Sequence, residues 1–212
     1  MKFDPQKHHH RSIRLKEYDY TAPGAYFITL VSWQRENIFG EILDGGIKLN
    51  QFGQIAKQQW EKLPRRFRHI ELDEFVIMPN HVHGIIVISA DRMGTAGDVY
   101  NNEAESSRRA DCMGTAGDVY NNKAESSCRA PSERFGQPVS GSIPTIVRSY
   151  KSSVSYRINL MRGTRGDPIW QRNYYEHIVR DVREWNRINQ YIIDNPFNWR
   201  DDDENPGKEF LP

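Results

Sequence analysis

The run from His81 to Ile88 constrains the fold of this chain more than any other stretch. Its sequence is His-Val-His-Gly-Ile-Ile-Val-Ile, so apolar residues fall on both alternating sides after the two histidines. Such a run is typical of a central strand that is buried on both faces of a sheet. Because residues two apart in a strand point to the same side, His81 and His83 should share one face. Two imidazoles so placed suit one metal ion, whereas a lone His-x-His motif without other support is usually a solvated surface.

Further segments rich in β-branched and aromatic residues predict the neighbours of this strand. They are residues 25–33 and 72–78, with a small hairpin over 39–49 around Asp44-Gly45, and residues 169–179 as the last strand or an extended segment. Residues 72–78 are joined to the central strand only by Pro79-Asn80, a connection too short for a crossover. These two strands should therefore be antiparallel neighbours.

Three segments carry the start and stop signals of helices. The predicted helices are residues 50–63, capped by Asn50 and ended by Pro64; residues 142–161, opened by Ser142; and residues 182–194, capped by Asp181. On the last helix apolar residues recur at helical spacing and should face the sheet. Tyr191 and Asn195 are four residues apart and should share a face at its last turn. Taken singly, packing would explain Tyr191 and a helix cap would explain Asn195.

Composition limits the class of protein. A chain of 212 residues can bury one ordinary domain, and its net charge of +1 argues neither for nor against a nucleic-acid partner. The two cysteines, Cys112 and Cys128, are too few for a disulfide framework and fit a reducing compartment. No apolar run reaches the roughly 18 residues of a membrane span, and the first residues lack the apolar core of a signal peptide. We expect a soluble, cytoplasmic protein with no membrane partner.

The chain divides into a folded region and three polar segments. Residues 1–23 form a basic N-terminal arm with a triple histidine, and residues 197–212 form an acidic C-terminal tail. Between them, residues 24–196 should be a single domain, interrupted at about 91–139 by an insertion. Within the insertion a 20-residue unit occurs twice, starting at Met93 and Met113. Two copies rich in Gly, Asn, Ser and Ala cannot bury a core of their own, which predicts a disordered insertion.

Positive charge is concentrated in two places. The residues concerned are Arg65, Arg66 and Arg68 beside Phe67, then Arg148, Lys151, Arg157, Arg162 and Arg165 along the predicted second long helix and its exit, and Arg172 beyond it. No acidic residue interrupts the helical group before Asp167. Such cations can neutralise several phosphates of a nucleic acid. The alternative is a solvated helix surface, which normally carries interspersed acids.

At this point the motifs together resemble a known family. They are Arg-Ser-Ile-Arg-Leu-Lys from Arg11, the segment from Tyr20 to Phe27, Met-Pro-Asn-His-Val-His from Met78, Trp-Gln-Arg-Asn-Tyr-Tyr-Glu-His from Trp170 and Tyr-Ile-Ile-Asp-Asn-Pro from Tyr191. In these motifs and in the order of its elements the chain resembles the REP-associated tyrosine transposases, which belong to the single-tyrosine HUH transposases of the smallest insertion sequences. The similarity covers nearly everything except the repeat insertion.

The resemblance implies a fold and a set of site residues. The fold would be α+β, a ferredoxin-like antiparallel sheet with helices on one face. His81 and His83 would be metal ligands, and Tyr191 would be the nucleophile. Asn195 would be the third ligand, at a position where the related enzymes have Gln. Such mixed nitrogen and oxygen ligands admit Mg²⁺ or Mn²⁺.

The resemblance also implies a reaction and a partner. The protein would cleave and rejoin single-stranded DNA at hairpins through a 5′-phosphotyrosine, as a monomer or a homodimer, and would be nucleoid-associated when bound to DNA. Two other classes remain open: a domesticated protein that binds hairpin DNA without covalent catalysis, and a phosphodiesterase that uses a metal and water. Tyr174 and Tyr175, near His177, compete with Tyr191 as nucleophile. They lack a second ligand four residues away on one helix.

Overall fold

The structure is a computed structural model that describes residues 18–90 and 139–208. Our predictions for the first 17 residues of the N-terminal arm, for the repeated 20-residue units and for the last four residues lie outside the described part of the chain. Within that part, no helix is long and apolar enough to cross a membrane.

An antiparallel sheet of four strands forms the centre of the molecule. The strands are β1 (Gly24–Val31), β4 (Ile70–Ile77), β5 (His81–Ile88) and β6 (Tyr175–Val179), in the order β4-β5-β1-β6. Strand β5 lies between β4 and β1, which confirms that the His-x-His run belongs to a central strand. In the register with β1, His83 lies opposite Thr29 and His81 opposite Val31.

A two-stranded hairpin, four α-helices and the 3-10 helices Trp33–Arg35 and Trp199–Asp201 complete the described fold. The hairpin and the α-helices have the following bounds: β2 (Gly40–Leu43) and β3 (Gly46–Leu49), then α1 (Gln51–Glu61), α2 (Leu63–Arg66), α3 (Ile143–Arg162) and α4 (Val182–Asp194). The predicted caps of α1 and α4 are confirmed, because the Asn50 side chain accepts from the backbone N–H of Phe52 and the Asp181 side chain accepts from that of Glu184.

One predicted element boundary is wrong, and the segment 169–179 is a strand over only part of its length. Pro64 does not end the helical region but stands in the first turn of the short α2, where its missing N–H costs nothing. The segment 169–179 contains both predicted forms, because its last five residues form β6 and pair with β1, whereas Trp170 makes a single bridge to Ser32. Between them the chain also lies against α3, where the Lys151 ammonium donates to the carbonyls of Gln171 and Arg172.

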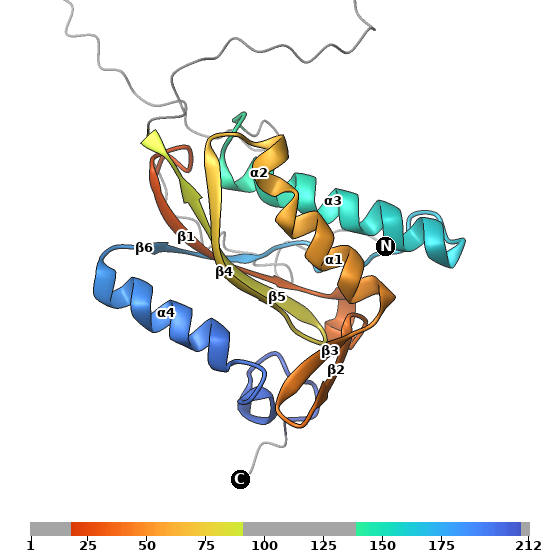
Figure 1. Ribbon diagram of the computed structural model, residues 1–212. Coiled ribbons are helices and arrows are strands. Elements are labelled where there is room, and N and C mark those ends of the chain that lie inside the picture. Colours follow the sequence, from red (N-terminus) through yellow and green to blue (C-terminus); the bar gives the residue numbers. More distant parts are fainter. Residues whose placement is uncertain (1–17, 91–138, 209–212) are drawn as a thin grey trace, which may run out of the picture.

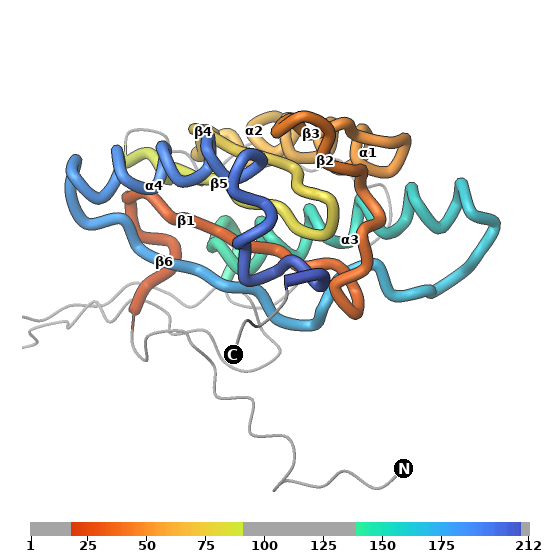
Figure 2. The backbone as a smooth tube through the Cα atoms, turned by 90° about the horizontal axis from the view of Figure 1, so that it is seen from below, coloured from red at the N-terminus to blue at the C-terminus, as the bar shows by residue number. Residues whose placement is uncertain are grey.

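Helices cover both faces of the sheet (Figures 1 and 2). On one face, Tyr26 and Ile28 of β1 pack in a cluster with Trp60 of α1 and Tyr150 of α3. On the other, the alternate β-strand residues, such as Ile85, pack against α4. The α+β class and the antiparallel sheet are therefore confirmed, whereas the expectation of helices on one face alone is wrong. The cause lies in β1 and β5, which carry apolar residues on both sides and need cover on both.

Gly84 is required where α1 approaches the sheet. A Cβ at this position would overlap the Trp60 ring and would lie 2.9 Å from the Cβ of Phe75. We therefore expect Gly84→Ala to lower the free energy of unfolding by about 1–3 kcal/mol, the usual cost of overpacking a core. Urea unfolding of the variant measures this. Gly46→Ala is the control, because its Cβ would meet only the Leu43 carbonyl at 3.6 Å. A smaller loss for Gly84 than for Gly46 would contradict the assignment.

Candidate metal and tyrosine site

His81 and His83 lie side by side on the face of β5 that α4 covers. Their ring centroids are 4.4 Å apart, and the two residues are 0% and 3% exposed. The face follows from strand alternation, since Ile85 continues the same side and belongs to the cluster with α4. The prediction that the two imidazoles share one face is confirmed, and they are buried, not solvated.

The neighbouring Asn80 determines which nitrogen of His81 carries the proton. The Asn80 Nδ2 donates to the backbone carbonyls of Arg35 at 3.0 Å and Glu204 at 2.7 Å. Its Oδ1 must therefore be the acceptor of the 2.9 Å hydrogen bond with Nδ1 of His81. The proton sits on Nδ1, so Nε2 carries a lone pair. This Nε2 is buried and has no hydrogen-bond partner among the described residues.

The imidazole of His83 is also oriented by hydrogen bonds. Its Nδ1 lies 2.8 Å from the Thr29 hydroxyl, and its Nε2 lies 3.2 Å from the hydroxyl of Tyr191. In the tautomer that matches His81, Nδ1–H donates to Thr29 and Nε2 accepts from the phenol. A hydrogen bond to one imidazole nitrogen orients the other toward a ligand, an arrangement common at metal sites.

Both imidazoles are neutral near pH 7. Burial lowers the pKa of His81 to about 4, against the opposing effects of the Asp202 carboxylate and the Asn195 side chain. Burial also holds the pKa of His83 well below its ordinary value, and neighbouring His81 adds to this. Neutral imidazole is the form that ligates a metal ion.

The last turn of α4 brings Tyr191 and Asn195 to the histidines. Tyr191 is 47% exposed, and its hydroxyl lies 3.2 Å from Nε2 of His83. Asn195 is buried, lies next to both His81 and Tyr191, and keeps an Oδ1 that has no partner among the described residues. The shared face predicted from their spacing is confirmed. Burial raises the pKa of Tyr191 to about 12, and nearby carboxylates add to the rise, so its hydroxyl is protonated here.

A further side chain in the site was missed by the sequence analysis. Residues 197–208 were expected to be part of an acidic tail, yet they form the 3-10 helix Trp199–Asp201 and then cross the site. Asp202 is 9% exposed, and its carboxylate, His81 and His83 offer ligand atoms that all lie within 4.8 Å of one another. The Trp199 ring lies 5.9 Å from that of His81. No spacing rule connects an acidic run to a histidine pair more than 100 residues earlier.

The donor atoms fit a divalent ion. His81 Nε2 and Asn195 Oδ1 are buried polar atoms without partners, and such atoms are costly unless something binds them. Two neutral imidazoles, an amide oxygen and a carboxylate form a mixed nitrogen and oxygen set that suits Mg²⁺ or Mn²⁺.

The competing tyrosines point to opposite faces of the sheet. Tyr174 packs against the core on the α3 side, whereas Tyr175 pairs with Thr29 and its ring contacts Phe27 on the α4 side. Only Tyr175 therefore lies on the face of the sheet that carries the histidines. The Nε2 of the nearby His177 lies 2.8 Å from Oε1 of Glu184 in α4.

Comparison with known proteins identifies a relative but no named family. No family model matches the chain. An uncharacterized protein of Haemophilus influenzae is 36% identical over 201 residues, which cover 95% of this chain and 96% of that protein. The chain belongs to the same family as this protein.

Two solved structures are similar at a lower level. One is a REP-associated tyrosine transposase bound to a REP hairpin, with a TM-score of 0.46, 16% identity, and coverage of 90% of this chain and 73% of that one. The other is a candidate transposase from Deinococcus radiodurans, with a TM-score of 0.41, 13% identity, and coverage of 86% and 97%.

Several of the predicted DNA-binding residues make contacts within the protein. Arg66 of α2 donates to the Ser149 and Ser153 hydroxyls of α3 and to Gln59. Lys151 donates to the carbonyls of residues 171–173, and burial lowers its pKa to about 8. The Arg162 guanidinium lies 4.6 Å over the ring of Phe52. These cations join elements together.

The other basic residues are exposed but do not form one stripe. Arg65 and Arg68 are exposed at α2 and just after it, and Arg165 is exposed beyond α3. Arg157 lies on the opposite side of α3 from Arg148, because nine residues make about two and a half helical turns. The cations along α3 therefore do not all lie on one side of the helix.

Some of these cations converge on a groove on the α3 side of the sheet. Arg148, Lys151 and Arg172 line this groove of about 420 Å³, together with Ser152 and Tyr174. Helix α3 covers the face of the sheet opposite to the one that carries His81 and His83. The groove and the histidine site are therefore separate features of the surface.

Proposed function

We propose that this protein is a metal-dependent enzyme that cleaves and rejoins single-stranded DNA, with Tyr191 as nucleophile and a 5′-phosphotyrosine as intermediate. One observation carries the proposal. The hydroxyl of the half-exposed Tyr191 lies 3.2 Å from the buried, neutral imidazole of His83. The Nε2 of the neighbouring His81 has no hydrogen-bond partner among the described residues. A hydroxyl on a half-exposed side chain therefore lies beside the proposed metal ligands. The motif resemblance supports hairpin-forming, REP-like DNA as the substrate.

The proposed ligands are His81, His83 and Asn195. Mg²⁺ or Mn²⁺ bound there would withdraw charge from a non-bridging phosphate oxygen, which makes the phosphorus a better electrophile. The three side chains reach the site from β5 and α4, so the sheet and the helix together hold the donor atoms. Rigid elements of this kind keep reacting groups in position.

Tyr191 supplies the covalent step. Its hydroxyl oxygen attacks the phosphorus, a phosphorus–oxygen bond forms, and the bond to the 3′ oxygen breaks. The phenol proton leaves to solvent, and the departing 3′ oxygen takes up a proton, so that a free 3′-hydroxyl and a 5′-phosphotyrosine result. Attack by a 3′-hydroxyl on the phosphotyrosine reverses the step and releases Tyr191. One phosphodiester replaces another in each direction, and no nucleotide cofactor is needed.

Labelled hairpin oligonucleotides test the proposal. The protein is incubated with Mn²⁺ and DNA labelled at the 5′ or the 3′ end, and then denatured and separated by electrophoresis. We expect the 3′ label to migrate with the protein and the 5′ label to appear on a shorter free strand. Two free fragments would indicate a phosphodiesterase that uses water. Intact DNA that is still bound before denaturation would indicate a binding protein without catalysis.

We also propose that the exposed cations bind DNA phosphates, foremost Arg148 and Arg172 at the groove. Replacing both with Ala should weaken DNA binding and reduce the slope of log affinity against log salt by about 1.4, since each phosphate contact with a single strand contributes about 0.7. Arg66→Ala is the control, because this side chain already donates to three partners within the protein. It should lower the melting temperature and leave the slope unchanged. An unchanged slope in the double variant would remove these two residues from the interface.

A further inference from the structure

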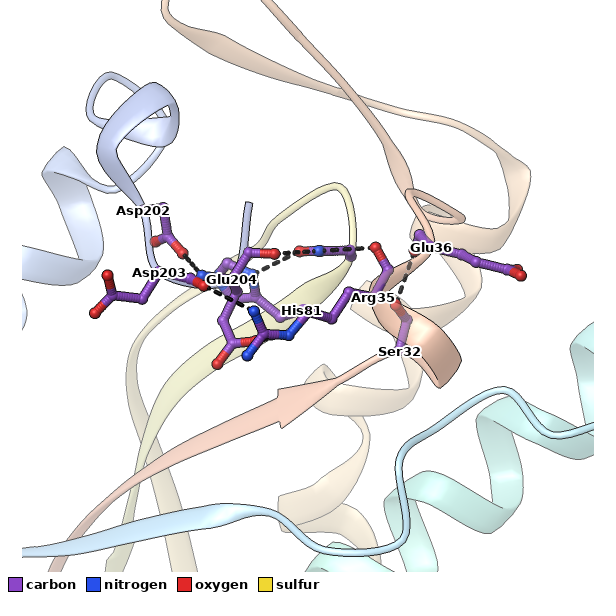
Figure 3. A network of polar contacts seen from close by, with 8 residues as sticks. Ser32, Arg35, Glu36, His81, Asp202, Asp203 and Glu204 are labelled. Atoms are coloured by element: carbon purple, nitrogen blue, oxygen red, sulfur yellow. Dashed lines mark hydrogen bonds and ion pairs between the residues drawn. The ribbon is translucent and has the colours of Figure 1, made fainter. Parts of the chain in front are cut away.

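The segment that follows α4 folds back across the histidine site and is fastened there (Figure 3). The Arg35 guanidinium pairs with the Glu204 carboxylate at 3.2 Å and donates to the carbonyl of Asp203 at 3.0 Å. From the other side, Asn80 donates to the Glu204 carbonyl while it also orients His81. Arg35 has a φ of 58°, a left-handed conformation that persists only where surrounding contacts require it.

Within this acidic segment one carboxylate points inward. Asp202 is buried, whereas Asp201 and Asp203 are exposed. Its Oδ2 accepts from Nδ2 of Asn195 at 2.8 Å, and its Oδ1 accepts from the backbone N–H of Glu204 at 2.7 Å. No lysine or arginine of the described residues forms an ion pair with it. A buried carboxylate with hydrogen bonds and no cationic partner is costly, and a bound cation would offset that cost.

We propose that Asp202 is a ligand of the divalent ion, supplied by the C-terminal segment, and that ion binding and docking of this segment are therefore coupled. The inference rests on the metal site of the proposed function. Donor atoms of His81, His83 and Asp202 lie within 4.8 Å of one another. Ligands of one ion at about 2.1 Å can be no more than about 4.2 Å apart, so a contraction of less than about 1 Å suffices. Asp202 also accepts a hydrogen bond from Nδ2 of Asn195. This bond orients the amide so that the Asn195 Oδ1 can bind the ion.

The Asp202 carboxylate changes which metal ions the site prefers. Two imidazoles alone suit Zn²⁺, Cu²⁺ or Ni²⁺, whereas added carboxylate and amide oxygens favour Mg²⁺ and Mn²⁺. One negative charge on the ligand set also strengthens the attraction for any divalent cation. Coupling between two binding events is reciprocal. If docking of residues 199–205 strengthens ion binding through Asp202, ion binding must stabilise the docked segment by the same free energy.

Titration calorimetry of the full chain with MnCl₂, without DNA, tests the ligand. We expect Asp202→Asn to weaken Mn²⁺ binding at least tenfold, given that even residues supporting a ligand cost about 10–100-fold when lost. Asp203→Asn is the matched control, because its carboxylate is 94% exposed and pairs with Lys208. It should bind like the parent. Equal affinity of the Asp202 variant and the parent would overturn the inference, as would a parent that binds no Mn²⁺.

Hydrogen exchange tests the coupling by a second measurement, in which the unaltered protein gives the result and His81→Ala serves only as the control. The reporters are the backbone amides of Asp202, Glu204 and Asn205, which bond within the segment. Mn²⁺ should slow their exchange in the parent, and not in His81→Ala, while the β2–β3 hairpin stays unchanged. Measured Mn²⁺ binding with no added protection at these amides would overturn the inference. An Mn²⁺-dependent DNA adduct would still stand in that case, which separates this failure from a failure of the proposed function.

Discussion

Tyr191→Phe should eliminate the covalent DNA adduct, with a loss of at least about a thousandfold, and should leave DNA binding unchanged. The substitution removes the attacking oxygen and so removes the covalent pathway itself. The ring remains, together with its contacts to Phe27 at 6.1 Å and His83 at 5.2 Å between centroids. Because Tyr191 is half exposed, the lost hydrogen bond should cost no more than about 1.5 kcal/mol of stability. The measurement is the protein-linked 3′ label on a denaturing gel.

Tyr175→Phe is the matched control for this experiment. Tyr175 lies on the same face of the sheet as His83, contacts the same Phe27 ring and is similarly exposed. The same atom is removed from the same side of the molecule, yet the adduct should persist. Tyr174→Phe should also retain it, since this side chain packs toward α3. Loss of the adduct in Tyr175→Phe but not in Tyr191→Phe would show that the nucleophile is Tyr175 of β6.

His83→Ala should abolish Mn²⁺-dependent cleavage and lower Mn²⁺ affinity beyond detection, and His81→Ala should do the same. Each substitution removes one of the two proposed nitrogen ligands. DNA binding should persist, because the exposed cations that we propose for it lie outside the histidine cluster. Filter binding measures the DNA affinity, and calorimetry measures the Mn²⁺ affinity. Full cleavage by either variant at saturating Mn²⁺ would refute the metal site.

Thr29→Val gives a graded version of the same test. Valine has nearly the shape of threonine, so the variant removes the partner of the His83 Nδ1 and little volume. Without that partner the imidazole can turn or change tautomer, and supporting groups of this kind are worth about 10–100-fold in metal affinity. We expect a loss of that size, smaller than the loss in His83→Ala. No difference between Thr29→Val and the parent would mean that the hydrogen bond does not orient the ligand.

Local sequence rules were sufficient for much of this site. Strand alternation predicted that His81 and His83 share a face, and the apolar run after them predicted that β5 is central. Helical spacing predicted that Tyr191 and Asn195 act from one turn of α4. These rules succeed because they apply within one element, where backbone geometry sets which side chains are neighbours.

Only the tertiary structure decided which groups meet between elements. Helix α4 covers the opposite face of the sheet from α1 and α3, and this brings Tyr191 over the histidines. In the folded chain, Arg66 and Lys151 form hydrogen bonds within the protein. The acidic segment after α4 crosses the site, and the Asp202 carboxylate lies close to His81. The hydrogen bond from Asn80 to Glu204 spans 124 residues of chain. Such pairs depend on how apolar faces pack and on where loops return the chain, and no periodicity along the sequence encodes either.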